Sequence, residues 1–289
     1  MVQFWLGDDW KRGTGRRSAS YASKPTALLH CNNRRILKSL TAAFGRPHEL
    51  RDAFGIAVLQ GQTMMQETLP RGRFRMREPF SGLSHLAGAA MSLVGLVLLI
   101  TLSGGEPWRT ISFGIYGASL VILYGASATY HLWSANDETL ERLRKCDHVG
   151  IFLLIAGSYT PVCLVPLRDV WGWSLFGIVW GIAVVGILAV LFWHGMPVWF
   201  DLVLYIIMGW LAILGIGHIA QAIGSAGVAW LIVGGVFYTV GAVVYASKRP
   251  RLWPGTFGSH DLWHLFVLAG SACHFMLMLG FVHPHDSRL

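Results

Sequence analysis

Charged residues are scarce in this chain. Only 13% of its 289 residues are charged and 54% are hydrophobic, whereas soluble domains carry about 25% charged residues. Cysteine is scarce as well, and the four cysteines, Cys31, Cys146, Cys163 and Cys273, form no paired motif. The sequence therefore implies no disulfide framework. The shortage of charge argues against a soluble domain and places the chain among membrane proteins.

The scarcity of charge is concentrated in seven long apolar runs. These runs cover residues 83–102, 110–133, 149–167, 171–193, 198–219, 226–246 and 262–282. None contains Lys, Arg or Glu, and each approaches or exceeds the roughly 20 residues that cross a bilayer. Lipid offers the backbone no partners, and the runs are continuously apolar without alternation, so helices are expected instead of barrel strands. We predict an all-α polytopic membrane protein, a bundle of seven transmembrane helices.

The basic residues are distributed unevenly around these runs. Fourteen of the 23 Lys and Arg residues precede the first run, six lie in loops on the same side, and three lie on the other side. The positive-inside rule then predicts a cytoplasmic N-terminus and an external C-terminus. Because most of the net charge of +8 comes from the N-terminal segment, we interpret it as a topology signal and expect no nucleic-acid partner.

Residues 1–77 have a different character from the rest. They are basic, show no clear apolar period and contain no signal-peptide pattern. One interpretation is a disordered cytoplasmic extension attracted to anionic lipid. The other is a misassigned start codon, with the true start at Met64, Met65 or Met76. Under either interpretation, residues 78–289 form the membrane domain.

Four polar side chains lie at or next to the ends of three apolar runs. His131 is near the end of the second run, Asp147 precedes the third, and His260 and His264 open the seventh. With the predicted topology, all four lie near the cytoplasmic face. Residues four apart share one face of a helix. His260 and His264 can therefore point at one object, and Ser127 and His131 can do the same.

Three neutral imidazoles and a water are the ligands of an open catalytic zinc site. The free position lets a bound water become acidic enough to act as a nucleophile. Asp147 would then be a base or a water holder outside the ligand set. Ser127 would hydrogen-bond a substrate carbonyl or the same water.

A plainer interpretation competes with the metal site. A single histidine at a helix end is usually an interfacial or hydrogen-bonded polar residue, and an H-x-x-x-H pair alone is a weak signal. For His274, deeper in the last run, a hydrogen bond between helices is the expected role. The metal site is favoured because the candidate residues share one depth while lying on different helices, and intramembrane ionisable residues commonly mark functional sites.

Five motifs occur in a characteristic order. They cover residues 78–85, 127–131, 147–151, 156–161 and 260–264. Together they resemble the hemolysin III family, the bacterial branch of the progestin and adiponectin receptor superfamily. The resemblance implies a seven-helix bundle in a bacterial inner (plasma) membrane, with zinc bound on the cytoplasmic side. It assigns zinc ligation to His131, His260 and His264, a water contact to Asp147, and a further role at the site to Ser127.

The resemblance leaves two classes of function open. One is a zinc-dependent, ceramidase-like hydrolase that acts on a lipid amide or ester and serves membrane lipid homeostasis. The other is a non-enzymatic pore-forming, haemolysin-type or membrane-stress protein in which the zinc is structural. The residues slightly favour the hydrolase, because a structural zinc usually has four protein ligands and only three strong histidines are found. Membrane lipids are the expected partners, and the oligomeric state stays open.

Overall fold

A computed structural model describes residues 76–250, 252–253 and 257–284. The expectation for residues 1–77 therefore lies outside the described residues, apart from 76 and 77. The described elements are α4 (Pro79–Leu102), α5 (Pro107–Leu132), α6 (Asp137–Leu164), α7 (Val170–Phe192), α8 (Val198–Trp210), η2 (Leu211–Gly215), α9 (Ile216–Ser247), α10 (Ser259–Leu277) and η3 (Met278–Val282). The all-helical prediction is confirmed for this part of the chain.

Polar residues set the beginnings of the helices. The Glu106 side chain accepts a hydrogen bond from the backbone N–H of Arg109 at the start of α5. Asp169 accepts two such bonds at the start of α7. Asn136 starts α6 well before the apolar run, in the charged segment that follows α5. These caps satisfy N–H groups that have no partner inside the helix.

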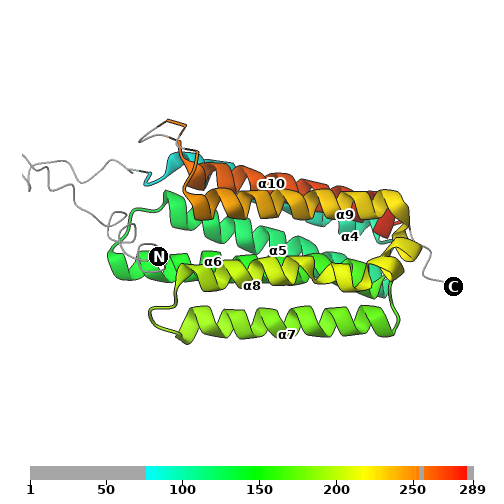
Figure 1. The fold of residues 1–289 in the computed structure, drawn as a ribbon. Coiled ribbons are helices and arrows are strands. Elements are labelled where there is room, and N and C mark those ends of the chain that lie inside the picture. Colours follow the sequence, from blue (N-terminus) through cyan, green and yellow to red (C-terminus); the bar gives the residue numbers. More distant parts are fainter. Residues whose placement is uncertain (1–75, 251, 254–256, 285–289) are drawn as a thin grey trace, which may run out of the picture. The chain divides into compact units, whose positions relative to one another are not determined.

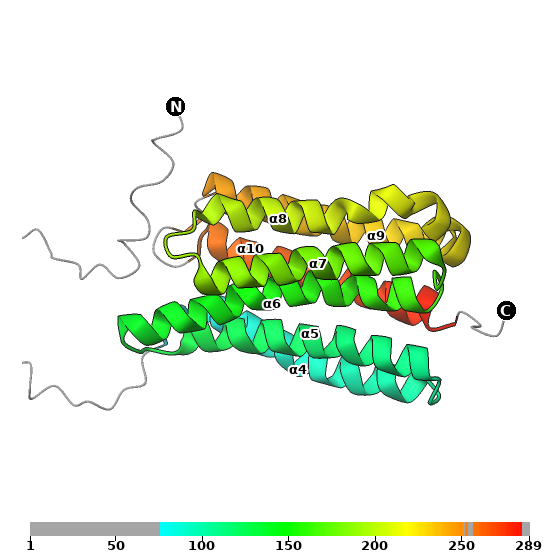
Figure 2. The ribbon, with the colours of Figure 1, turned by 90° about the horizontal axis from the view of Figure 1, so that it is seen from below.

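The helices pack as a bundle in which successive elements are neighbours. α4 packs on α5, α5 on α6, and α6 on α7, while α10 packs on α9 and also contacts α4. Figures 1 and 2 show the helices running along one common axis. α5 ends where α4, α6 and α10 begin, and we call this the histidine end. A backbone hydrogen bond from Glu78 N–H to His131 O, 3.0 Å long, joins the start of α4 to the end of α5 there.

Six of the described helices are long and apolar enough to cross a membrane. One of them, Trp199–Ser247, has 49 residues and includes α8, η2 and α9. It is interrupted at Gly224, where φ is 72° and ψ is 170°, a conformation outside the helical region. In Figure 1, α8 and α9 run in opposite directions. The predicted runs 198–219 and 226–246 lie on the two sides of this interruption.

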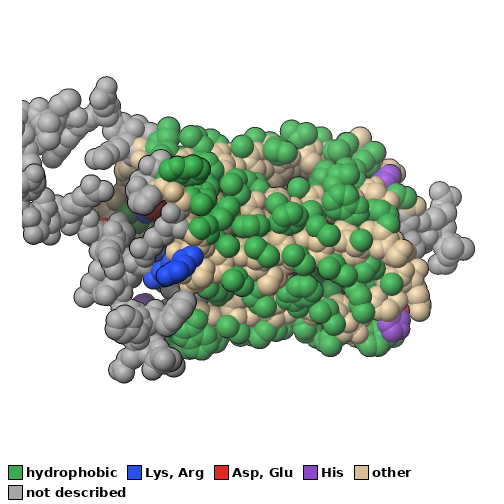
Figure 3. All heavy atoms as spheres, turned by 45° about the horizontal axis from the view of Figure 1, so that its top comes forward, with side chains coloured by type: hydrophobic (Ala, Val, Ile, Leu, Met, Phe, Trp, Pro, Cys, Tyr) green, Lys and Arg blue, Asp and Glu red, His purple; other side chains and the backbone are tan. Residues whose placement is uncertain are grey.

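The outer surface of the bundle is apolar. Large hydrophobic side chains such as Met91, Val170 and Phe192 are widely exposed. Figure 3 shows hydrophobic side chains over the middle of one face, with Lys and Arg seen only at the histidine end. Contiguous exposed apolar surface of this extent is unusual for a soluble protein. The surface fits the hydrocarbon core of a bilayer.

Candidate metal centre

Two helices bring three histidines to the histidine end. His131 is the penultimate residue of α5, and His260 and His264 lie in the first turns of α10. The start of α10 is fixed by Asp261, which accepts a hydrogen bond of 2.9 Å from the backbone N–H of Gly258. Ser81 of α4 donates a bond of 2.6 Å to the same carboxylate. This capping arrangement holds the first turns of α10 against α4.

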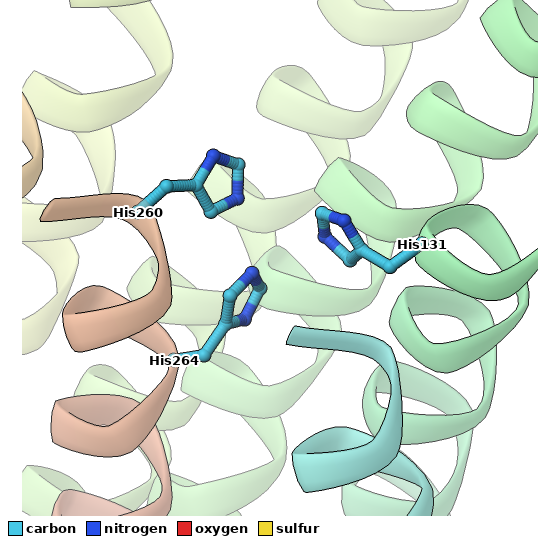
Figure 4. Close-up of side chains that lie close together, drawn as sticks. All are labelled: His131, His260 and His264. Carbon is cyan, nitrogen blue, oxygen red and sulfur yellow. The ribbon is translucent and has the colours of Figure 1, made fainter. Parts of the chain in front are cut away.

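The three imidazoles converge as the sequence predicted. One nitrogen of each lies within 4.8 Å of the corresponding nitrogens of the other two. The rings of His131 and His264 have centroids 4.7 Å apart, and those of His260 and His264 are 4.8 Å apart. His131 and His264 are buried, whereas His260 is exposed. Figure 4 shows the three rings directed toward one another from α5 and α10.

Two of the histidines have a hydrogen-bond partner in α4 or directly before it. Glu78 Oε2 lies 2.5 Å from Nδ1 of His131, and Nε2 of His85 lies 2.9 Å from Nδ1 of His264. A carboxylate only accepts hydrogen bonds, so Nδ1 of His131 carries the proton. A free lone pair on Nε2 of His264 requires the same tautomer, in which Nδ1–H donates to His85. Both Nε2 atoms are then lone-pair donors.

Those two Nε2 atoms have no hydrogen-bond partner among the described residues, although both are buried. Buried polar atoms almost always have a hydrogen-bond partner, so these two unbonded nitrogens need an explanation. A cation at the centre of the group would take both lone pairs. Three neutral imidazoles suit zinc, and ligating histidines commonly donate their other N–H to a carboxylate or another acceptor. His131, His260 and His264 therefore fit a metal ion.

Glu78 supplies negative charge next to the group. Burial raises the pKa of Glu78, but the hydrogen bond with His131 and the positive charge of Arg77 act against it, and the pKa falls from 4.5 to about 2. The carboxylate is therefore ionised at neutral pH. A carboxylate hydrogen-bonded to Nδ1 makes Nε2 of His131 a stronger electron donor toward a cation.

The two other predicted site residues, Asp147 and Ser127, are buried near this end. Asp147 lies in α6, one helix away from His131, and does not belong to the three-histidine group. Ser127 is one turn before His131 in α5, and its Oγ has no partner among the described residues. Both positions agree with residues that would not bind a metal directly. Their chemical roles stay predictions.

The residue after Asp147 is held by α8. His148 Nε2 lies 3.9 Å from the buried carboxylate of Asp201, and Tyr205 donates a hydrogen bond of 3.0 Å to the His148 carbonyl. His148 Nδ1–H also donates to the carbonyl of Arg144, at 2.9 Å. Three contacts therefore fix the turn of α6 that carries Asp147.

Sequence reasoning gave no role to Glu78 and His85. Both belong to the first motif, residues 78–85, at the start of the first apolar run. The sequence could have indicated both residues, because α4 begins at the same end of the bundle as α10 and its start lies level with the three histidines. His274 has the role expected of it: its Nε2–H donates to the Leu231 carbonyl of α9, at 3.3 Å.

An apolar cavity lies beside the helix that carries His260 and His264. Its walls come from α5 to α10, and its lining includes Tyr205, Tyr238, Trp263, Val267 and His274. Trp263 and Val267 flank His264 along α10. A cavity with such walls suits a hydrocarbon chain more than a polar ligand.

The apolar helices and the buried histidine group define a polytopic membrane protein with a candidate metal centre. The family described as "Haemolysin-III related" matches residues 74–275 of the chain. The chain is 36% identical to "Hemolysin-3" of Bacillus cereus, an alignment that covers 74% of this chain and 96% of that protein. It is 28% identical to the human "Monocyte to macrophage differentiation factor", over 66% of this chain and 79% of the relative.

A more distant relative is the "Adiponectin receptor protein" of Drosophila melanogaster, 27% identical over 66% of this chain and 48% of the relative. The chain belongs to the haemolysin III family, which the first comparisons show, and it has relatives among adiponectin-receptor proteins. The resemblance inferred from the five motifs is thereby confirmed.

Proposed function

We propose that the protein is a zinc-dependent hydrolase of the bacterial plasma membrane that acts on a lipid amide or ester. The supporting observation is the unequal exposure of the three histidines. His131 and His264 are buried and direct free nitrogens inward, while His260 is exposed. A metal held by three ligands at an open mouth keeps a position for water and substrate, which is typical of catalytic zinc.

Seven membrane crossings are part of this proposal. A continuous helix of 49 residues would be about 74 Å long, more than twice the roughly 30 Å of a hydrocarbon core. The interruption at Gly224 divides the segment into 26 residues of α8, η2 and early α9 and 23 residues of later α9. Each part is long enough for one crossing.

The proposed orientation places the histidine end in the cytoplasm. Among the described residues near the helix ends, six Lys or Arg lie at the histidine end and two, Arg109 and Arg168, lie at the opposite end. The six are Arg77, Arg142, Arg144, Lys145, Lys248 and Arg249. The positive-inside rule then favours a cytoplasmic N-terminus and an external C-terminus. Substrate would reach the site from the inner leaflet.

In the proposed mechanism, bound zinc would supply a Lewis acid that polarises a carbonyl and acidifies water. Glu78 fixes the tautomer of His131, and His85 hydrogen-bonds Nδ1 of His264. The Asp147 carboxylate accepts the proton of the attacking water and returns it to the leaving group. Ser127 Oγ donates a hydrogen bond to the substrate carbonyl. The apolar cavity beside α10 would hold the hydrocarbon chain.

The second candidate is a non-enzymatic membrane protein of the haemolysin or membrane-stress type. It is favoured by the name of the Bacillus cereus relative and by the two helices that supply the ligands. A metal bound by His131 and His264 would clamp α5 to α10 and stabilise the bundle without chemistry. In that case Asp147 would have no catalytic task.

Asp147→Asn separates the two candidates. An amide cannot accept the proton of water at neutral pH, so hydrolysis of a ceramide-like amide in detergent should fall about 10²–10⁴-fold while zinc stays bound. Asp137→Asn is the matched control, because Asp137 is an exposed acid in the first turn of the same helix. Full activity of Asp147→Asn, measured both as hydrolysis and as complementation of a deletion strain, would exclude the hydrolase mechanism.

A further inference from the structure

A line of polar side chains runs through the inside of α5. Ser112, Tyr116, Tyr124, Ser127 and His131 are all buried. At 100° per residue they fall on one side of the helix. The line covers 20 residues, whose 19 steps rise about 28 Å along the axis, close to the roughly 30 Å of a bilayer core. Polar side chains therefore occur at intervals along α5 from one side of the hydrocarbon core to the other.

Three of these side chains lack a protein partner. Ser112 Oγ, Tyr116 OH and Ser127 Oγ are buried, and none makes a hydrogen bond to another described residue. Tyr116 and Ser127 are both 0% exposed. In lipid each unpaired polar group costs several kcal/mol, and buried water is the usual partner of such groups. These three hydroxyls mark positions for water.

Hydroxyl groups of α9 and α10 extend the line at mid-depth. Tyr124 donates a hydrogen bond of 2.7 Å to Ser271 Oγ, and the hydroxyls of Ser271 and Tyr238 are 2.9 Å apart. His274 lies one turn further along α10, with its ring centroid 5.4 Å from that of Tyr238. We call the set of Ser112, Tyr116, Tyr124, Ser127, Tyr238, Ser271 and His274 the polar seam.

The members of the polar seam are spaced along the membrane normal. Measured from His131, Ser127 lies about 6 Å deep, Tyr124 about 10 Å, Tyr116 about 22 Å and Ser112 about 28 Å. His274 lies about 15 Å beyond His264 on the antiparallel α10. Steps of this size can be bridged by one to a few waters. Each hydroxyl can accept one hydrogen bond while donating another.

We propose that the polar seam holds a file of water that carries protons between the histidine end and the opposite end of the bundle. A proton arriving at one oxygen forms a new O–H bond, and that oxygen releases its other proton to the next member. One proton enters and one leaves, with no other bond changed. The path uses the side chains of the polar seam and water and does not require a metal or hydrolytic activity, so it goes beyond the proposed function.

Proteoliposomes of phosphatidylcholine and phosphatidylglycerol test the proposal. A potassium gradient with valinomycin drives proton entry, and a trapped pH-sensitive dye reports it. The wild type should acidify the vesicles faster than protein-free vesicles do. Tyr116→Phe and Tyr124→Phe should lower the rate to that of protein-free vesicles. Tyr159→Phe is the matched control, because Tyr159 is a buried tyrosine outside the seam, bonded to the Met208 carbonyl and the Ala212 N–H, and it should keep the wild-type rate.

Thermal melting gives an independent readout of the same seam. If Tyr116 OH is hydrated, Tyr116→Phe should melt at a lower temperature; in a dry seam, removing an unpaired hydroxyl should raise it. Ser112→Ala replaces Tyr116→Phe if that variant does not yield monodisperse protein. A wild-type flux equal to protein-free vesicles would overturn the proposal. So would an unchanged flux in Tyr116→Phe, or an equal loss in Tyr159→Phe.

Discussion

Replacing Glu78 by Gln should weaken metal binding without changing a ligand. The Glu78 carboxylate contacts Nδ1 of His131 at 2.5 Å and is ionised at neutral pH. Gln keeps a carbonyl oxygen that can accept the same bond, but it removes the negative charge. A hydrogen bond to an ionised acceptor is roughly twice as strong as a neutral one. The variant should therefore retain the geometry and lose part of the affinity.

The expected loss of metal affinity depends on how deeply His131 and Glu78 are buried. Mutation of such an outer hydrogen-bond partner typically costs 10–100-fold in metal affinity, about 1.4–2.7 kcal/mol. His131 is fully buried but the Glu78 side chain is 44% exposed, and solvent weakens the charge interaction. We expect a loss near tenfold. His85→Leu should cost more, because it leaves the buried Nδ1–H of His264 without an acceptor.

Chelator competition with cobalt and zinc measures this affinity, and the cobalt absorption spectrum reports the ligand geometry. Glu106→Gln is the matched control, since Glu106 likewise directly precedes a helix, at the opposite end of the bundle. The pKa of Glu78 is lowered, so the stability that its carboxylate contributes to the fold is present above the ordinary pKa of 4.5 and is lost as the pH falls toward about 2. Equal affinities of wild type and Glu78→Gln at neutral pH would refute this assignment.

Two further predictions concern topology and packing. In a cysteine-free background, a cysteine replacing Trp133 should react with an impermeant reagent only from the cytoplasmic side, and one replacing Arg168 only from outside; the reverse pattern would move the site to the other face. Gly150→Ala should destabilise the bundle by about 1–3 kcal/mol, because its Cβ would lie 2.9 Å from the Leu123 Cα. Gly177→Ala, where the Cβ meets open space, should melt like the wild type in detergent.

The apolar runs predicted the helices well but their boundaries only in part. Hydropathy places the third helix at residues 149–167, whereas α6 begins at Asp137. The first turns of α6 are charged, and their helical state depends on the Asn136 cap and on ion pairs such as Glu138 with Arg142. An apolar window cannot detect these interactions. The interruption at Gly224, in contrast, matches the polar and small residues between two predicted runs.

The sequence predicted those site residues whose depth in the membrane can be read from their position at a helix end. His131, His260 and His264 were found because their places at helix ends fix their height in the membrane. Their partners Glu78 and His85 were not assigned, because a hydrogen bond depends on how α4 is rotated against α5 and α10. Hydropathy does not encode that rotation. The polar seam was missed for the same reason, since single hydroxyls spaced along an apolar helix show their common side only in the packed bundle.

The metal content of purified protein tests the central claim most directly. Wild-type protein should carry about one zinc per chain, measured by elemental analysis after detergent purification. His260→Ala and His264→Ala should each lose it, while His218→Ala, which alters a histidine stacked on Trp171 at the opposite end, should keep it. Stoichiometric zinc in the His260→Ala, His264→Ala double variant would contradict the three-histidine centre.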